Sequence, residues 1–228
     1  RSTTGHERSA AIRNYYCSAR CHPAHKEIAL RIQISSIIKE AWLLGRCVKP
    51  LITFSDGRTL RLFMQIGRNI PNSDENNIGF IARCEVCGDQ LIMKLKDMKN
   101  WKNCLCKDKS RHLVINGPLW LGELQSPAFI EQLINIAEKN ALPIQNRTKK
   151  TLEKLKSDEG LPPNSWSTAE LASRLSLLEQ PKTLSLARLL EKEGYLANCN
   201  AIMPGQIRTN APFKKLLSIC RSTKTSRC

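Results

Sequence analysis

The stretch Leu51-Ile-Thr-Phe-Ser-Asp-Gly-Arg-Thr-Leu-Arg-Leu-Phe-Met-Gln-Ile66 carries the clearest local fold signal in the chain. Two runs rich in β-forming residues flank Asp56-Gly57, and Asp-Gly between such runs favours a β-hairpin because both turn positions can adopt positive φ angles. The second run alternates, so that one face consists of Leu60, Leu62, Met64 and Ile66. The sequence therefore predicts a hairpin that is buried on one face.

The segment before this hairpin predicts a helix from His25 to Arg46. Its apolar residues recur at helical spacing, and Gly45 stands where a helix C-cap is expected. The stretch after the hairpin, 69–77, is polar and contains Pro71, which is typical of a linker. We therefore expect a first unit over 1–68, a linker over 69–77 and a second unit over 78–219.

Two cysteine pairs open the second unit within the predicted knuckle 78–116. They are Cys84 and Cys87, followed by Cys104 and Cys106. This spacing predicts a zinc-ribbon-like site in which four thiolates hold one structural Zn²⁺. Two disulfides, a redox dithiol at Cys84 and Cys87, and a three-cysteine site completed by His112 remain as alternatives.

Other chemistry-bearing residues are weaker candidates. Cys17 and Cys21 lie near His22 and His25, but no further ligand pair completes a metal site there. A lysine-rich segment between the two cysteine pairs is either a solvated rim or a finger that contacts phosphate. Its lysines are Lys94, Lys96, Lys99 and Lys102.

The C-terminal half predicts mainly helices. Two amphipathic helices are expected at Pro127–Asn140 and Arg147–Asp158. A module over 164–216 follows, with helices at Thr168–Leu178 and Leu184–Gly194 and then two strands, Tyr195–Ile202 and Gln206–Thr209. This order is typical of a winged-helix-like module, and residues 220–228 read as a basic tail.

The composition narrows the class of protein. Among the 228 residues, 36 Lys and Arg stand against 20 Asp and Glu, which gives a net charge of +16 and favours a polyanionic partner such as nucleic acid. The 41% apolar content argues against global disorder. We expect no membrane span and no secretory signal. We also expect a reducing, cytoplasmic location, because four of the 10 Cys are crowded into one segment. No protein partner is indicated.

Several motifs of small-molecule enzymes do not occur in this sequence. No glycine-rich loop follows a strand, and no Walker, H-E-x-x-H or G-x-S-x-G motif is found. The chain begins at Arg1, without a Met, inside what reads as running domain sequence. We therefore expect it to be a fragment or a processed piece of a larger protein.

Three stretches together resemble the tRNA (guanine(26)-N2)-dimethyltransferase family. They are Asn116-Gly-Pro-Leu-Trp-Leu-Gly122, Thr168-Ala-Glu-Leu-Ala-Ser-Arg-Leu175 and Gly205-Gln-Ile-Arg-Thr-Asn-Ala-Pro212. The Ala11–Tyr15 and His22-Pro23 region is similar to the part that follows the family's catalytic motif. The resemblance covers the chain up to about Ile219.

The resemblance implies an α/β fold, in which residues 1–68 end a class I Rossmann-like methyltransferase sheet, followed by an α+β C-terminal domain. It implies methyl transfer from S-adenosyl-L-methionine to a guanine amine in tRNA, and many members carry a zinc site like the four cysteines. The family's cofactor loop and its Asp-Pro-Phe-Gly motif would lie upstream. We therefore assign no catalytic or cofactor-binding residue to this chain, and we expect it to be inactive alone. The alternative is a DNA-binding regulator built from a zinc ribbon and a winged helix.

Five basic residues are candidates for contacts with tRNA phosphates: Arg208, Arg188, Lys214, Lys215 and Lys150. Arg208 stands inside the third family motif, where a guanidinium would suit a bidentate phosphate contact. The competing interpretation is that Arg208 pairs with an acidic neighbour such as Glu191 and holds the wing in place.

Overall fold

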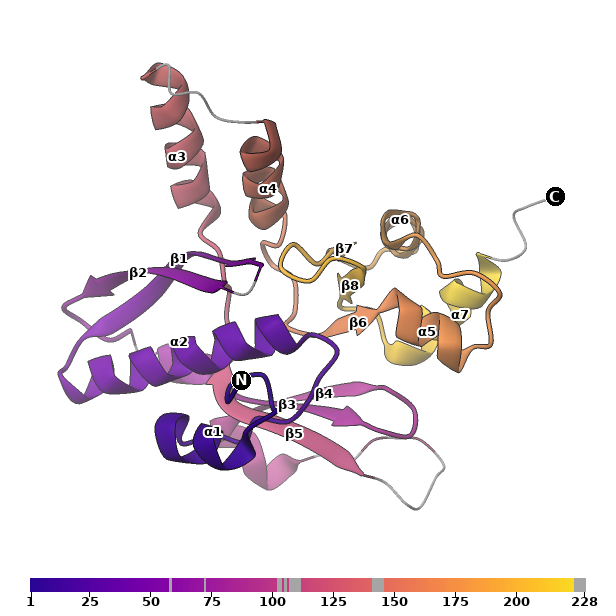
Figure 1. Ribbon diagram of the computed structural model, residues 1–228, viewed down its shortest axis with the longest axis horizontal. Helices are drawn as coiled ribbons and strands as arrows, with labels where there is room; N and C mark the ends of the chain where they lie inside the picture. The colour runs from indigo at the N-terminus through magenta and orange to yellow at the C-terminus, as the bar shows by residue number, and fades with distance from the viewer. Residues whose placement is uncertain are drawn as a thin grey trace.

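The computed structural model describes residues 1–57, 59–71, 73–101, 104, 106, 112–140 and 146–223. Within these residues, helices and strands are interspersed along the chain (Figure 1). Their bounds are α1 Arg8–Tyr15, α2 His25–Leu43, β1 Cys47–Asp56, β2 Thr59–Gly67, η1 Asp74–Asn77, β3 Ile78–Cys84, β4 Gln90–Lys94, η2 Leu95–Asn100, β5 Leu113–Trp120, α3 Pro127–Lys139, α4 Asn146–Lys156, β6 Ser165–Ser167, α5 Thr168–Arg174, α6 Thr183–Lys192, β7 Ala197–Cys199, β8 Gln206–Thr209 and α7 Phe213–Ser222.

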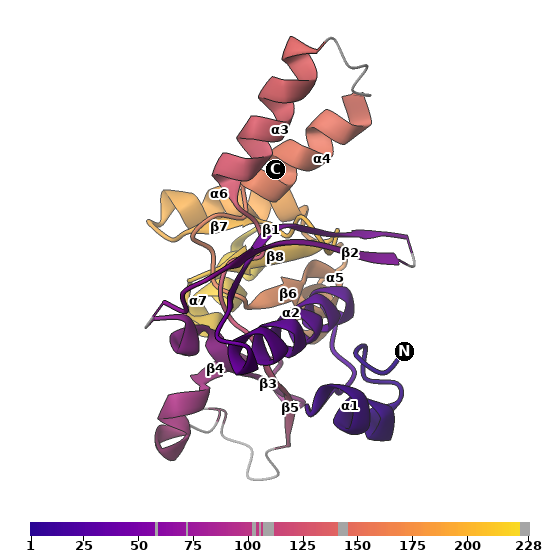
Figure 2. The ribbon, with the colours of Figure 1, turned by 90° about the vertical axis from the view of Figure 1, so that its left-hand side faces the viewer.

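Helix α2 lies at the centre of the first half. It runs between the β1–β2 hairpin and the three-stranded sheet β4–β3–β5 (Figures 1 and 2). Leu30, Ile34 and Ile38 join one core with β1, whereas Ile28 and Ile32 join a second core with α1, β3 and β5. A helix covered on two sides needs apolar residues on more than one face, which explains why the isoleucines and leucines of α2 are spread around its circumference.

The predicted hairpin and the helix before it are confirmed. β1 and β2 pair antiparallel, with Asp56 opposite Thr59, and Gly57 has a φ of +57° at the turn. Leu60, Leu62 and Met64 face the core as predicted, but the prediction was wrong for Ile66, the fourth residue of that face, which is 69% exposed. Arg58, the residue after the Asp-Gly pair, lies outside the described residues.

The predicted linker at 69–77 does not separate two cores. Residues 74–77 form η1, and Ile78 and Trp120 pack in the same core as Leu30 and Val48. Residues on the two sides of the predicted boundary therefore share one core, because α2 needs both the hairpin and β5 to cover it.

The sheet around the knuckle contains a strand that the sequence did not predict. β4 pairs with β3 through Ile81 and Ile92, whereas the sequence analysis interpreted the lysine-rich segment that begins at Lys94 as a solvated rim or a finger that contacts phosphate. The predicted knuckle over 78–116 begins with β3 and ends within β5. Lys102, one of the four lysines of the finger, lies outside the described residues.

Helices α3 and α4 form an arm that projects from the body (Figures 1 and 2). Both helices were predicted nearly to their ends, and the Ser126 hydroxyl caps α3 by accepting the Phe129 N–H at 3.4 Å. Lys149 pairs with Glu138, and Lys156 pairs with Glu131, across the two helices. Leu155 anchors the arm to the central core.

The C-terminal module consists of the sheet β6–β8–β7 with α5, α6 and α7 around a core of its own. Its two predicted helices and two predicted strands are present, with shorter bounds for the first helix and the first strand. The sequence analysis missed α7, whose apolar stripe buries Cys220 completely. The predicted basic tail therefore loses its first residues to this helix, and 224–228 lie outside the described residues.

Across the described ranges, the helices are all too short or too polar to cross a bilayer.

Candidate metal centre and buried ion cluster

The structure brings the four predicted cysteines together. The Sγ atoms of Cys84 and Cys106 are 3.8 Å apart, those of Cys87 and Cys104 are 3.2 Å apart, and all four lie within 4.8 Å of one another. Four sulfurs at about 2.3 Å from one Zn²⁺ in tetrahedral geometry are about 3.8 Å from each other. The donor set and its spacing therefore fit a closed, structural zinc site.

The backbone of the knuckle is preorganised for this cluster. The Gly88 N–H donates to the Cys84 carbonyl at 2.9 Å, and the Cys84 N–H donates to the Asp89 carbonyl at 2.9 Å. Gly88 has a φ of +84°, a region that side-chain-bearing residues rarely adopt. The Cys106 N–H points at the Cys104 sulfur at 3.4 Å, a contact that stabilises a thiolate.

The thiols of the cluster differ in acidity. Burial raises the pKa of Cys104 to about 11. Burial acts in the same direction on Cys84, but the backbone N–H groups of Cys87 and Val86 outweigh it, so the pKa of Cys84 is lowered. Bringing four thiolates this close is unfavourable without a cation between them, which is what a bound metal would provide.

The geometry of the cluster does not match disulfides or a site completed by His112. The closest Sγ pair, at 3.2 Å, is well beyond the roughly 2.05 Å of a disulfide, and the described cysteines are free. His112 is exposed and is not a member of the cluster. At the N-terminus, the thiols of Cys17 and Cys21 face the backbone carbonyls of Ala11 and Gly5.

The knuckle is fastened to α5 of the C-terminal module. Arg174 donates to the Val86 carbonyl at 2.6 Å and to the Glu85 carbonyl at 3.2 Å, both inside the Cys84–Cys87 turn. Glu170 holds Arg174 at 2.7 Å and also pairs with Arg83 of β3. A Cβ added to Gly88 would lie 2.7 Å from the Arg174 Nε atom, so this contact also needs a glycine. Sequence patterns gave no signal for this clamp.

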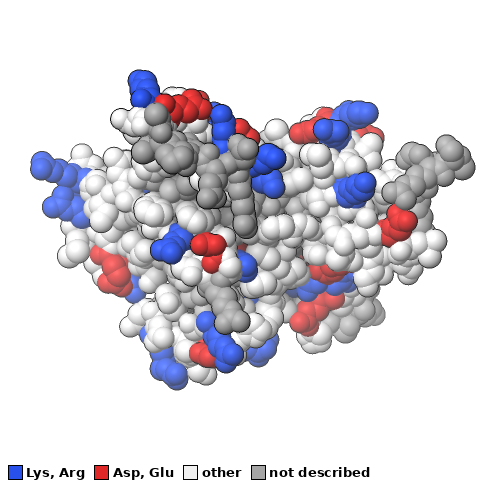
Figure 3. All heavy atoms as spheres, turned by 45° about the horizontal axis from the view of Figure 1, so that its top comes forward, with Lys and Arg blue, Asp and Glu red and all other residues white. Residues whose placement is uncertain are grey.

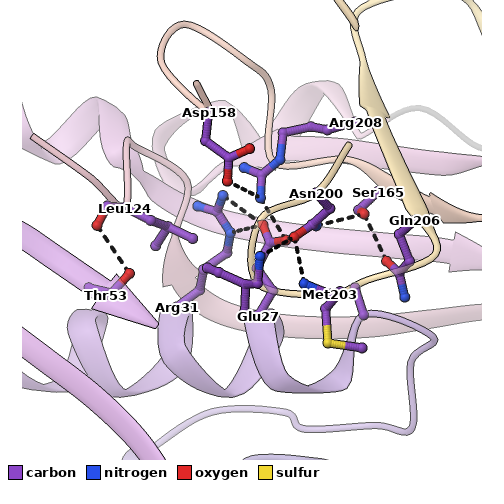
Figure 4. Close-up of polar contacts among 12 residues, drawn as sticks. Glu27, Arg31, Thr53, Leu124, Asp158, Ser165, Asn200, Met203, Gln206 and Arg208 are labelled. Carbon is purple, nitrogen blue, oxygen red and sulfur yellow. Dashed lines mark hydrogen bonds and ion pairs between the residues drawn. The ribbon is translucent and has the colours of Figure 1, made fainter. Parts of the chain in front are cut away.

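A second polar cluster lies buried where α2 meets the C-terminal module (Figure 4). Glu27 accepts from the Arg31 Nε atom at 2.9 Å, from the Arg208 Nη2 atom at 2.8 Å and from the Asn200 amide at 2.5 Å. Asp158 lies 3.6 Å from Arg208. Glu27, Arg31 and Arg208 are no more than 2% exposed. Two carboxylates thus face two guanidinium groups out of contact with water.

The charges of this cluster depend on each other. Burial alone would raise the pKa of Glu27, but Arg208 and Arg31 outweigh it and hold that pKa below its usual range. For Asp158 the balance is reversed: burial raises its pKa to about 6, although Arg208 opposes the shift. Glu27 is therefore the carboxylate on which both arginines converge.

This cluster corrects the assignment of Arg208 to tRNA phosphate. Its guanidinium is buried against Glu27 and Asp158 and cannot reach a phosphate at the surface. A structural clamp was the competing interpretation, but the partner is Glu27, not the exposed Glu191. The sequence pattern missed this pair because its members are 181 residues apart.

The other four candidate RNA contacts lie on three helices. Lys150 of α4, Arg188 of α6 and Lys214 of α7 are exposed, whereas Lys215 pairs with Glu193 at 2.9 Å. Lys and Arg side chains are scattered over the face in Figure 3, with acidic groups among them. The structure does not gather these candidates into one patch, and their role stays a prediction.

The buried side chain of His22 makes the free energy of unfolding depend on pH, and a single substitution can measure this contribution. Burial and the charge of Arg83 lower its pKa from the usual 6.5 to about 4. As pH falls from 6.5 toward 4, the unfolded chain takes up a proton that the folded chain refuses, so the free energy of unfolding decreases. Asp158 acts in the opposite direction over the same range, because its raised pKa makes the folded state take up a proton first.

Between pH 7.5 and pH 4.5, the free energy of unfolding of the wild-type protein should fall by up to about 3 kcal/mol more than that of His22→Asn. The asparagine carbonyl can still accept the Ala24 N–H that now reaches the His22 Nδ1 atom at 3.0 Å. Urea unfolding of both proteins at the two pH values measures the difference. Equal losses would contradict the buried, neutral imidazole.

Comparison with known proteins places the chain in a family. The family model for N2,N2-dimethylguanosine tRNA methyltransferase matches residues 2–221. The chain belongs to this family. It is 27% identical over 97% of its length to the tRNA (guanine(26)-N(2))-dimethyltransferase of Methanobrevibacter smithii, and 28% identical over 93% to that of Aeropyrum pernix. Family membership does not favour the alternative of a DNA-binding regulator.

The same family includes a solved structure with a similar fold. The complex of Trm1 from Pyrococcus horikoshii with S-adenosyl-L-methionine superimposes with a TM-score of 0.73, at 19% identity, over 96% of this chain and 56% of that one. The mixed α/β fold is therefore that of Trm1. The chain spans 57% of the Methanobrevibacter relative and 53% of the Aeropyrum relative, about half of their length.

Proposed function

We propose that the protein transfers methyl groups from S-adenosyl-L-methionine to the exocyclic amine of guanine 26 in tRNA. We also propose that these 228 residues are its tRNA-binding part. The observation that carries this proposal is the family match over nearly the whole chain. The cofactor would be held by residues outside these 228, which contain no glycine-rich loop after a strand and no Asp-Pro-Phe-Gly motif.

The β1–β2 hairpin supports a larger sheet. A two-stranded sheet has two open edges and is marginal by itself. Phe63 and Ile66 of β2 remain 53% and 69% exposed, and Leu43 and Leu44 at the end of α2 remain 75% and 78% exposed. We propose that these strands end a class I methyltransferase sheet whose other strands lie elsewhere in the protein.

Zinc and the C-terminal module are the other two parts of the proposal. Cys84, Cys87, Cys104 and Cys106 would hold one Zn²⁺ that stabilises the knuckle and takes no part in methyl transfer. The strand order β6–β8–β7, with α5 and α6 between β6 and β7, supports a winged-helix-like module. Its exposed cations, Arg188 and Lys214, would contact tRNA phosphates.

The proposal is tested with the full-length protein and an unmodified tRNA transcript. Methyl incorporation should be detected with guanine at position 26 and should disappear when that position is adenine, which has no N2 amine. The 228-residue chain alone should compete for tRNA without methylating it. Preference for duplex DNA over tRNA, or methylation that survives the adenine substitution, would contradict the proposal.

A further inference from the structure

A cavity of about 500 Å³ opens between the cysteine knuckle and the C-terminal module. Cys87 and Asp89 of the knuckle form one wall, and Trp166, Phe213 and Leu217 form the other. We call it the knuckle pocket. Its volume falls in the range of pockets that hold small organic ligands.

The module side of the pocket is aromatic and apolar. The rings of Trp166 and Phe213 are stacked, with centroids 5.9 Å apart and an interplanar angle of 18°. Leu217 and Pro212 extend this wall along the first turns of α7. Such a wall suits a flat, apolar-faced ligand.

Two residues of the pocket carry buried polar atoms that lack a partner. The Trp166 Nε1–H donor and the Asn164 Oδ1 acceptor have no hydrogen-bond partner in the part of the chain that the structure describes. Trp166 is 95% buried, with 5% of its surface exposed. Buried polar groups are normally satisfied, so a donor and an acceptor left open beside one pocket indicate a ligand that offers the complementary pair.

The charges around the pocket select among such ligands. The knuckle wall offers hydrogen-bond acceptors, the Asp89 carboxyl and the cysteine sulfurs, which disfavour an anion there and favour an amino group. Lys214 is exposed on the opposite wall and is the one cation among the described residues that line the pocket. A nucleotide fits these features, because its base has a flat face and an acceptor beside an N–H donor, and its phosphate can stay outside the pocket near Lys214.

We propose that the knuckle pocket binds one nucleobase of an unpaired or everted nucleotide, with its phosphate next to Lys214. The base face lies against the apolar wall, and the base edge satisfies Trp166 and Asn164. That the nucleotide belongs to tRNA rests on the proposed function, whereas a free nucleotide would present the same chemistry.

A substitution that fills the pocket in the full-length protein tests the proposal. Leu217→Trp places a ring in the cavity and should weaken tRNA binding about tenfold, the effect of losing one stacked base. The slope of log K against log salt should stay unchanged, because no phosphate contact is lost. Leu178→Trp is the matched control, since Leu178 is 94% exposed and does not line the pocket. It should bind as the wild type does.

Two further variants keep the test decisive. Lys214→Ala should reduce the salt slope by about 1. Asn164→Leu removes the acceptor and should weaken binding, whereas Asn164→Asp, which keeps an acceptor, should weaken it less; this pair decides the matter if Leu217→Trp does not fold. Wild-type affinity for both tRNA and nucleoside monophosphates in folded Leu217→Trp, or in Asn164→Leu, would overturn the proposal.

Nucleoside monophosphates separate the two sources of the base. If tRNA supplies it, millimolar monophosphates should compete only weakly and Leu217→Trp should lose tRNA affinity. If a free nucleotide is the ligand, a monophosphate should bind the wild type, fail to bind Leu217→Trp, and leave tRNA affinity equal in both. If the wild-type protein binds neither tRNA nor any nucleoside monophosphate, the proposal of a base-binding pocket is overturned. Failure of tRNA methylation alone contradicts only the proposed function.

Discussion

Arg208→Ala is expected to lower the free energy of unfolding by about 3–5 kcal/mol, the usual cost of removing one partner from a buried ion pair. The cost arises because Glu27 would keep a negative charge away from water with only Arg31 and Asn200 to stabilise it. Urea unfolding at neutral pH measures the loss. Arg208→Lys should recover part of it, because an ammonium restores the charge but makes fewer hydrogen bonds than a guanidinium.

Lys214→Ala is the control for this prediction, because Lys214 is exposed and has no ion pair in the described structure. Its free energy of unfolding should stay within about 0.5 kcal/mol of the wild-type value. The outcome that would restore the original assignment is specific: Arg208→Ala would keep wild-type stability but bind tRNA more weakly, with a salt slope smaller by about 1. That result would place Arg208 at the RNA, not in the core.

Loss of zinc from the knuckle is the second large effect that we expect. Structural zinc in small finger peptides contributes about 10–16 kcal/mol of apparent binding free energy at neutral pH, and much of that is folding free energy. Elemental analysis of freshly purified, reduced protein should find one zinc per chain. Cys104→Ser should lose it, whereas Cys21→Ser should keep it, since Cys21 is exposed and lies outside the cluster.

Chelation should show where that energy acts. Amide hydrogen exchange should increase first in β3, β4 and β5, and then in α5, because Arg174 binds the carbonyls inside the Cys84–Cys87 turn. Full zinc occupancy in Cys104→Ser would remove Cys104 from the site. Protein purified without zinc, with the same exchange pattern before and after addition of zinc, would mean that the knuckle folds without metal.

Local signals in the sequence were sufficient for most elements of the fold. The hairpin at Asp56-Gly57, the helix at α2 and the cysteine pairs each depend on residues close together in the chain, and each is present in the structure. β4 was missed because its short run, from Gln90 to Lys94, passes directly into a lysine-rich segment that reads as solvated.

The ion cluster could not be predicted in the same way. Glu27 and Arg31 are a recognisable i,i+4 pair, but nothing local distinguishes a buried pair from the solvated ones that are common on helices. Its other members come from the segments around Asp158, Asn200 and Arg208, so only the tertiary fold brings them together. The same holds for the Arg174 clamp on the knuckle, whose partners are 88 and 89 residues away.

The ion cluster also bears on the order in which the protein is made. A ribosome synthesises Glu27 well before Arg208, which follows 181 residues later, so the carboxylate lacks its second guanidinium while these residues are made. Arg31, one helical turn away, is synthesised almost at the same moment and can neutralise Glu27 in the meantime. The nascent chain therefore never has to bury an unpaired carboxylate, and the last strand, β8, completes the charge balance when it arrives.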